Sequence, residues 1–260
     1  MNFYFIDTHA HLFWQNFSED IEKVLERALS NNVKKIVLPN VDLQSIPLLK
    51  KTVLLNKQML YPLMGLHPSS VKSDYKAVLL QMEQELKNTK YYGIGEIGID
   101  LYWEENKKFV AEQKQAFRLQ LQWAKQKKLP VVIHTRNSFE IVYNIVKEEN
   151  DDSLMGVFHC FTGSYEQAMK VIDLGGFYLG IGGVITFKNS KLAQVIKQIP
   201  INYLVLETDS PFLTPYPHRG KRNESSYIPL IAQKLSEIKN IPLSQVASIT
   251  TQNALSLFKI

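Results

Sequence analysis

The chain has 260 residues, 45% of them hydrophobic and 21% charged, a composition typical of a globular protein with a large buried core. Its single cysteine, Cys160, excludes an internal disulfide, and no uncharged apolar run reaches the roughly 18 residues that a membrane helix needs. The formal net charge of +5 is compatible with a polyanionic partner but also with a solvated lysine-rich surface, so charge alone identifies no partner.

The N-terminal residues carry neither the basic segment nor the apolar stretch of a secretory signal peptide before the first acid, Asp7. Together with the lone cysteine, this predicts a protein of a reducing compartment, and we expect it in the cytoplasm and away from membranes. No low-complexity stretch, Gly/Ser linker or marked shift in composition interrupts the chain. We therefore expect residues 1–260 to form a single domain.

Short apolar runs, several of them rich in Val, Ile, Tyr and Phe, recur along the chain, as expected for buried strands. In chain order they cover residues 3–6, 35–38, 60–64, 91–94, 130–133, 155–158, 177–179 and 203–206. Longer segments with apolar residues at helical spacing separate them. Ser18 is expected to cap the first helix, and further helices are predicted over residues 105–128, 137–149 and 164–174.

Strands that alternate with helices indicate a parallel sheet with right-handed crossovers. Eight such units favour a closed barrel over an open doubly wound sheet. The sequence therefore predicts an α/β fold of the TIM type, a (β/α)8 barrel. Residues 224–260 are expected to add extra C-terminal helices packed on the outside of this barrel.

Metal-binding side chains recur where the predicted strands end. Five of the six histidines lie there, namely His9, His11, His67, His134 and His159. Glu96 follows the fourth predicted strand and Asp209 follows the eighth. Because the carboxyl ends of parallel barrel strands meet at one face, these distant residues are expected to converge.

Four imidazoles and two carboxylates at one barrel mouth are a set that binds divalent metals. His9 and His11 lie two residues apart, so both rings can point to the same side of an extended chain. Six ligands with water are enough for two metals that share a carboxylate. Each residue alone has an ordinary structural explanation, such as a hydrogen-bonded histidine or a turn aspartate, but that explanation does not account for their shared position.

These residues occur within familiar motifs. Asp7-Thr8-His9-Ala10-His11-Leu12 resembles the opening of the amidohydrolase superfamily. Four later motifs, taken in order and spacing, resemble the TatD family of metal-dependent deoxyribonucleases: Gly95-Glu96-Ile97-Gly98-Ile99-Asp100, His134-Thr135-Arg136, His159-Cys160-Phe161-Thr162-Gly163 and Glu207-Thr208-Asp209-Ser210-Pro211. The resemblance extends over nearly the whole chain and includes Arg219-Gly220-Lys221-Arg222-Asn223-Glu224. The chain departs from it at Ser225, where proline is frequent, and at Ile99, where leucine is common.

The resemblance implies an amidohydrolase-like barrel in which His9, His11 and Asp209 hold one divalent ion. His134 and His159 would hold the second, with Glu96 as the bridge. Mg²⁺ would be the working ion, with Zn²⁺ or Mn²⁺ as alternatives. The implied activity is hydrolysis of DNA phosphodiester bonds, commonly as a 3′→5′ exonuclease or as an AP-endonuclease-like phosphodiesterase.

In such a reaction the metals would clamp the phosphate and activate a water, from which Asp209 could accept a proton. Arg136 is placed to grip phosphate, and a surface ion pair is its alternative. His67 could orient substrate or protonate a leaving oxygen, or could be a hydrogen-bonded loop residue. The basic loop with Arg219, Lys221 and Arg222 is expected at the barrel mouth, where it could track a nucleic-acid backbone or form a solvated turn.

Tyr102 and Trp103 could stack on a base, but packing into the wall is the more common use of such residues. The leading alternative function is an amide or ester hydrolase on the same scaffold, such as a D-aminoacyl-tRNA deacylase. A non-catalytic metal- or nucleic-acid-binding protein is a further alternative, but it predicts a missing ligand, and all six are present. We expect DNA as substrate and no obligate protein partner.

Overall fold

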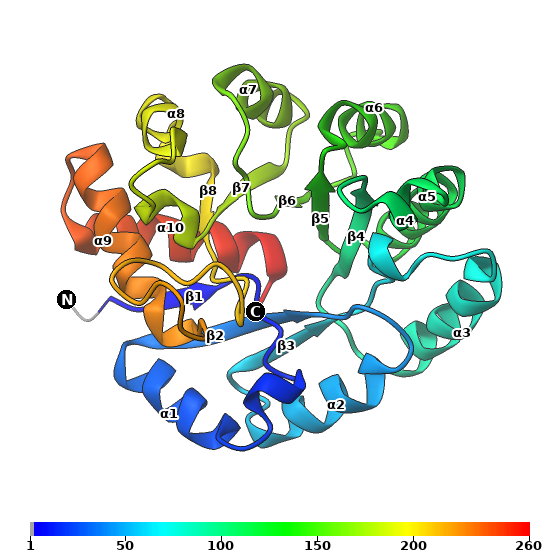
Figure 1. Ribbon diagram of the computed structural model, residues 1–260, viewed down its shortest axis with the longest axis horizontal. Helices are drawn as coiled ribbons and strands as arrows, with labels where there is room; N and C mark the ends of the chain where they lie inside the picture. The colour runs from blue at the N-terminus through cyan, green and yellow to red at the C-terminus, as the bar shows by residue number, and fades with distance from the viewer. Residues whose placement is uncertain (1–2) are drawn as a thin grey trace.

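The computed structural model describes residues 3–260, and its eight parallel strands are arranged around a common axis (Figure 1). The strands are β1 (Phe5–Asp7), β2 (Val33–Pro39), β3 (Leu60–Leu63), β4 (Ile94–Asp100), β5 (Val131–Arg136), β6 (Gly156–Phe158), β7 (Phe177–Ile181) and β8 (Leu204–Leu206). Hydrogen bonds join them in chain order within two groups, β1 to β3 and β4 to β8.

Two isolated parallel bridges close the ring between these groups. Met64 pairs with Ile94 at the β3–β4 junction, and Ala10 pairs with Ser210 just beyond β1 and β8. The Thr8 amide also donates to the Leu206 carbonyl at 3.0 Å. The predicted TIM-type (β/α)8 barrel is therefore confirmed.

Helices surround the strands (Figure 1). They are α1 (Ile21–Ser30), α2 (Ser45–Leu55), α3 (Tyr75–Asn88), α4 (Glu104–Lys107), α5 (Val110–Lys127), α6 (Phe139–Glu149), α7 (Tyr165–Asp173), α8 (Leu192–Gln198), α9 (Ile228–Lys239) and α10 (Leu243–Phe258), with 3-10 turns η1 (Gln15–Phe17), η2 (Pro68–Ser70), η3 (Gly183–Thr186), η4 (Ile201–Tyr203) and η5 (Ser225–Tyr227). Most of their apolar faces join the strands' outward side chains in one large core. Within residues 3–260, no helix is both long and apolar enough to cross a membrane.

Two predicted helix boundaries are wrong. Ser18 does not cap α1, because the helix begins at Ile21 and Ser18 instead ends the short 3-10 turn η1. The helix expected over residues 105–128 is divided into α4 and α5. Sequence periodicity locates a helical segment but does not resolve such local breaks.

The fourth strand lies later than its apolar run predicts. The prediction covers residues 91–94, whereas β4 spans Ile94–Asp100 and is buried along its whole length. Its glycines and Glu96 resemble a loop in the sequence, yet the strand pairs with β5 from Ile97 to Asp100. Glu96 therefore lies within its strand rather than after it, as does His134, because β5 continues to Arg136.

Residues 224–260 were predicted to pack on the outside of the barrel. The C-terminal helix α10 instead also contributes to the interior of the barrel. Its last turns share one buried apolar cluster with inward-facing strand residues: Ile6, Val37, Tyr61, Leu63, Val132, Val157, Val205, Ala254, Leu257 and Phe258. In Figure 1 the C-terminus lies near the middle of the ring of strands. This helix thus closes the amino-terminal end of the barrel and leaves the opposite, carboxyl end for the site.

Candidate metal centre

The carboxyl end of β1 supplies two imidazoles to one point. His9 and His11 follow Asp7, and both rings are buried. The bridge of Ala10 to Ser210 holds the intervening backbone extended, so the two side chains point to the same side. Their Nε2 atoms lie 3.1 Å apart.

Two carboxylates complete a first cluster around these nitrogens. Glu96 Oε2 lies 3.2 Å from His9 Nε2 and 3.4 Å from His11 Nε2. Asp209 Oδ1 lies 3.6 Å and 3.7 Å from the same two atoms. The edges of a tetrahedron of ligands around an ion about 2.1 Å away are roughly 3.4 Å long. The four side chains are therefore spaced for coordination of one cation.

The other oxygen of Glu96 faces a second cluster. Glu96 Oε1 lies 2.8 Å from His134 Nδ1 and 2.9 Å from His159 Nε2. His67 Nε2 is 3.3 Å from both Glu96 Oε1 and His134 Nδ1. Glu96 thus turns one oxygen to each cluster, which is the geometry of a bridging carboxylate. The structure brings together all six sequence-predicted ligands, and His67 joins them.

Burial and neighbouring charges set the protonation of this centre. Burial by itself raises the pKa of Glu96, but the imidazoles of His67, His159 and His9 hold that pKa well below its usual range. Burial lowers the pKa of His9 well below its ordinary value. At neutral pH Glu96 is therefore ionised and His9 is neutral, which are the states that bind a divalent ion. Burial lowers the pKa of His159, but the carboxylates of Glu96 and Glu207 raise it well above its ordinary value, so a bound ion would displace the proton of this ring.

Asp100 positions His134, a role that was not predicted from the sequence. Its Oδ2 lies 3.1 Å from His134 Nε2, and its Oδ1 accepts from the Tyr102 amide at 2.9 Å. This contact leaves Nδ1 of His134 facing Glu96. The signal was present in the sequence, because residues 96, 98 and 100 of a strand point to the same side.

Glu207 lies beneath His159 and was also not assigned. Its side chain is fully buried, and its Oε1 accepts from the Cys160 amide and lies 3.7 Å from His159 Nδ1. Its Oε2 and the Nδ1 atoms of His9 and His159 have no hydrogen-bond partner among the described residues. The carboxylate also fills the space beside Gly180, where an added Cβ would overlap Glu207 Oε2. The Glu207 carboxylate therefore lies close to two candidate metal ligands, His9 and His159.

A pocket of about 650 Å³ opens above the clusters. His67 and Arg136 both line it, as do the aromatic side chains of Trp14, Trp103 and Phe212. The Arg136 guanidinium lies over the Tyr102 ring at 3.7 Å and 5.9 Å from the Trp103 ring centroid. Tyr102 and Trp103 are 47% and 58% exposed, so they do not pack into the wall as the sequence analysis favoured.

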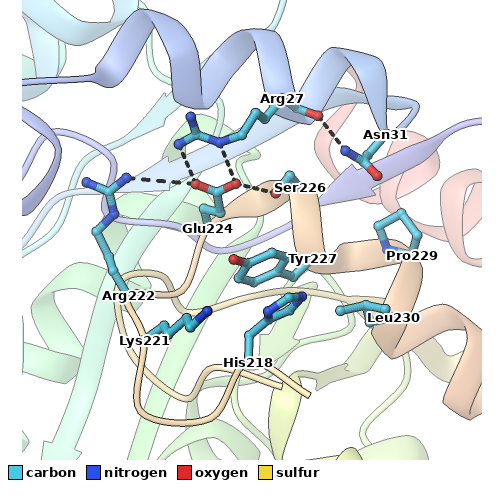
Figure 2. A pocket seen from close by; sticks show the side chains of 10 residues that line it. All are labelled: Arg27, Asn31, His218, Lys221, Arg222, Glu224, Ser226, Tyr227, Pro229 and Leu230. Carbon is cyan, nitrogen blue, oxygen red and sulfur yellow. Dashed lines mark hydrogen bonds and ion pairs between the residues drawn. The ribbon is translucent and has the colours of Figure 1, made fainter. Parts of the chain in front are cut away.

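The basic loop lies outside this pocket lining. Arg219 rests on the Phe187 ring at 3.8 Å, and Arg222 pairs with Asp20 through both terminal nitrogens, each at 2.8 Å. Lys221 and Arg222 line a separate cleft on α1 and the start of α9 (Figure 2). None of Arg219, Lys221 and Arg222 lines the metal-centre pocket, so their contact with substrate at the barrel mouth stays a prediction.

The end of this loop ties the site to the barrel. Asn223 donates to the carbonyls of Thr208 and Phe212, which fixes the turn that carries Asp209. Ser225, the departure from the family pattern, is buried and donates to Asp7 Oδ2 at 2.6 Å. The substitution thus adds a hydrogen bond at the β1–β8 closure, away from the candidate ligands' metal-facing atoms.

The chain is similar to known proteins along almost its whole length. Residues 6–259 match the family described as TatD related DNase. An uncharacterized metal-dependent hydrolase of Bacillus subtilis, YabD, is 40% identical over 255 residues, 98% of each chain. The crystal structure of the TatD homologue YjjV of Escherichia coli superposes with a TM-score of 0.91 at 32% identity and 98% coverage of both chains.

A TatD family hydrolase from Entamoeba histolytica also superposes, with a TM-score of 0.81 at 25% identity and 99% coverage of both chains. The family match spans nearly the whole chain, and the motifs that carry the resemblance lie around the clustered histidines and carboxylates. The chain therefore belongs to the TatD family of metal-dependent hydrolases.

Proposed function

We propose that the protein hydrolyses DNA phosphodiester bonds from the 3′ end of a strand. The observation that carries this proposal is the position of Arg136. Its guanidinium lines the pocket of the metal-ligand clusters, and the Tyr102 ring holds it at 3.7 Å. A planar, permanently charged fork beside a cation site suits a phosphate group better than a neutral amide or ester.

Two divalent ions would be held by this chain. His9, His11 and Asp209 suit one ion, His134 and His159 suit the other, and Glu96 offers one oxygen to each. Mg²⁺ is the proposed working ion, with Zn²⁺ or Mn²⁺ as alternatives that imidazole-rich sites accept. Bound there, such ions would neutralise phosphate charge and lower the pKa of a bound water.

The aromatic walls of the pocket suit the end of a DNA strand. Trp14 and Phe212 meet edge to face at 5.2 Å, and Phe212 is 49% exposed, so a terminal base can stack there. Asp209 lies at the pocket surface with its side chain 16% exposed, where it can accept the proton of the attacking water. With the base and phosphate held, the water oxygen bonds to phosphorus while the bond from phosphorus to the 3′ oxygen of the preceding nucleotide breaks. That 3′ oxygen takes up the proton that Asp209 accepted, and the terminal nucleotide leaves with the phosphate.

His67 is proposed to donate a hydrogen bond to a substrate oxygen. Its Nδ1 accepts from the Ser69 amide at 3.1 Å, which leaves the proton of the neutral ring on Nε2. This atom lies 3.3 Å from Glu96 Oε1 and His67 lines the pocket, so a substrate oxygen would share this donor with Glu96. Burial lowers the pKa of His67, so the ring is neutral at pH 7 and stabilises charge rather than giving up a proton. This role fits the sequence prediction of substrate contact.

The test is a metal panel on defined substrates. A single-stranded oligonucleotide labelled at its 5′ end is incubated with Mg²⁺, Mn²⁺ or Zn²⁺, and with chelator. Shortening of the labelled strand one nucleotide at a time, abolished by chelator, is the expected result. Hydrolysis of ester or D-aminoacyl-ester substrates with intact DNA would instead support the alternative function.

Removal of the Arg136 guanidinium is expected to weaken substrate binding. A hydrogen bond to a charged group contributes about 1.5–3 kcal/mol, so Arg136→Ala should raise KM for the oligonucleotide roughly 10- to 100-fold. Metal content should stay unchanged because Arg136 is not a candidate ligand. Arg118→Ala is the matched control, since Arg118 pairs with Glu148 and Glu149 on the surface. An unchanged KM for Arg136→Ala would remove Arg136 from phosphate recognition.

A further inference from the structure

A second cleft lies beside the loop that follows β8, between that loop, α1 and the beginning of α9 (Figure 2). Its volume is about 680 Å³. In Figure 2, His218 and Lys221 lie on the loop side and face Arg27 of α1 across the Tyr227 ring. Among the described residues, none lines both this cleft and the metal-centre pocket.

One of the cations that line the cleft has no carboxylate partner among the described residues. Arg27 donates to both oxygens of Glu224, at 2.8 Å and 2.7 Å, and Arg222 is held by Asp20. Three cations, counting Lys221, thus stand against two carboxylates. Lys221 is exposed, and across residues 3–260 no carboxylate oxygen lies within the 4.0 Å ion-pair distance of its Nζ. The unpaired charge is therefore the Lys221 ammonium.

A planar surface lies next to this charge. The His218 ring stacks on the Tyr227 ring with their centroids 4.5 Å apart and their planes within 11° of parallel. Leu230 extends this surface along the start of α9. An exposed ammonium beside stacked aromatic and apolar side chains matches a ligand with a phosphate and a flat base.

We propose that this cleft binds a nucleotide unit, with its phosphate at Lys221 and its base against the His218–Tyr227 surface. The ligand class rests on the proposed function, because a DNA hydrolase meets both strands and released nucleotides. One loop links the two sites: Asp209 and Phe212 line the metal-centre pocket, and His218 and Lys221 line the cleft. A DNA strand whose end lies in the pocket can follow this loop outward to the cleft. A released nucleotide would present the same groups to the cleft, a phosphate and a flat base.

Binding measured without hydrolysis tests this proposal. Fluorescence anisotropy of a labelled 12-nucleotide single strand is followed in chelator for the wild type, Lys221→Glu and Lys57→Glu. Lys57 is an exposed lysine before β3, at the opposite end of the barrel, so it matches the charge change away from the cleft. Lys221→Glu should raise Kd at least about fivefold and reduce the salt dependence by about one counterion, and Lys57→Glu should leave both near wild type.

Competition with unlabelled dAMP identifies the source of the ligand. Displacement of the strand by dAMP from the wild type but not from Lys221→Glu supports a site for free nucleotide. Lys221-dependent strand binding without displacement supports a path for the strand. Equal Kd values for Lys221→Glu and Lys57→Glu, with native circular dichroism, would overturn the proposal, and Lys221→Gln should repeat the loss more weakly.

The two proposals fail separately. DNA hydrolysis with binding that does not depend on Lys221 overturns the cleft alone. Lys221-dependent binding without hydrolysis under any metal overturns the proposed function alone, since the binding assay contains chelator.

Discussion

Asp209→Asn is expected to lower kcat on DNA by about 10²- to 10⁴-fold at saturating metal, the range for loss of a general base. The amide keeps the shape of the carboxylate and an oxygen near His9 and His11, but it cannot accept a proton. Measurement of kcat with the labelled oligonucleotide, alongside metal content, checks this result.

The fold should survive this substitution for a specific backbone reason. Asp209 has a φ of 56°, in the left-handed region, which asparagine tolerates better than most residues. The backbone N–H of residue 209, which donates to the His9 carbonyl at 2.9 Å, is unchanged by the substitution. An aspartate at another left-handed position, the exposed Asp152 with φ 65°, gives the matched control Asp152→Asn. Near wild-type kcat in Asp209→Asn would show that another group takes the proton.

The barrel was predictable because its strands are short apolar runs between turns. All eight predicted runs overlap or adjoin an observed strand. The largest displacement is at β4, where Gly95, Glu96 and Gly98 interrupt the apolar pattern within a buried strand. Two of the three have a reason that a linear pattern does not show: Gly98 lies against the His134 backbone, and Glu96 points to the metal-ligand clusters.

The convergence of the candidate ligands was predictable from topology alone. Parallel strands bring their carboxyl ends to one face, so His9 and Asp209 meet although 200 positions separate them. The ring nitrogen that each histidine uses was not predictable. His134 faces Glu96 with Nδ1 because Asp100 holds its Nε2, and that contact depends on the register between β4 and β5.

For the basic loop, the sequence does not show which charges are free to bind a ligand. In the sequence, Arg219, Lys221 and Arg222 look equally available to a polyanion. In the structure Arg222 is paired with Asp20, and Arg219 lies on Phe187 outside the cleft lining. Among the described residues that line the cleft of Figure 2, Lys221 is therefore the cation without a carboxylate partner. Sequence gives the number of charges in a loop, but their pairing depends on helices that the loop meets only after folding.

The second large effect is expected at Glu207. His159 would bind metal through Nε2, which faces Glu96, and this leaves the proton on Nδ1, 3.7 Å from Glu207 Oε1. A carboxylate behind a metal-binding histidine fixes the ring and makes it a better ligand, and its loss typically costs 10- to 100-fold in metal affinity or activity. Glu207→Gln should therefore weaken metal binding by about that factor.

Calorimetric titration of metal into the apoprotein measures this effect without any substrate. Glutamine preserves the side-chain volume beside Gly180 and can still accept from the Cys160 amide, so the barrel should fold normally. Glu224→Gln is the control, because Glu224 is also buried but is paired with Arg27 away from the clusters. If Glu207→Gln bound metal as tightly as the wild type, the 3.7 Å approach would be packing alone. If it lost affinity and the control did not, the Glu207 charge would be part of what makes His159 a ligand.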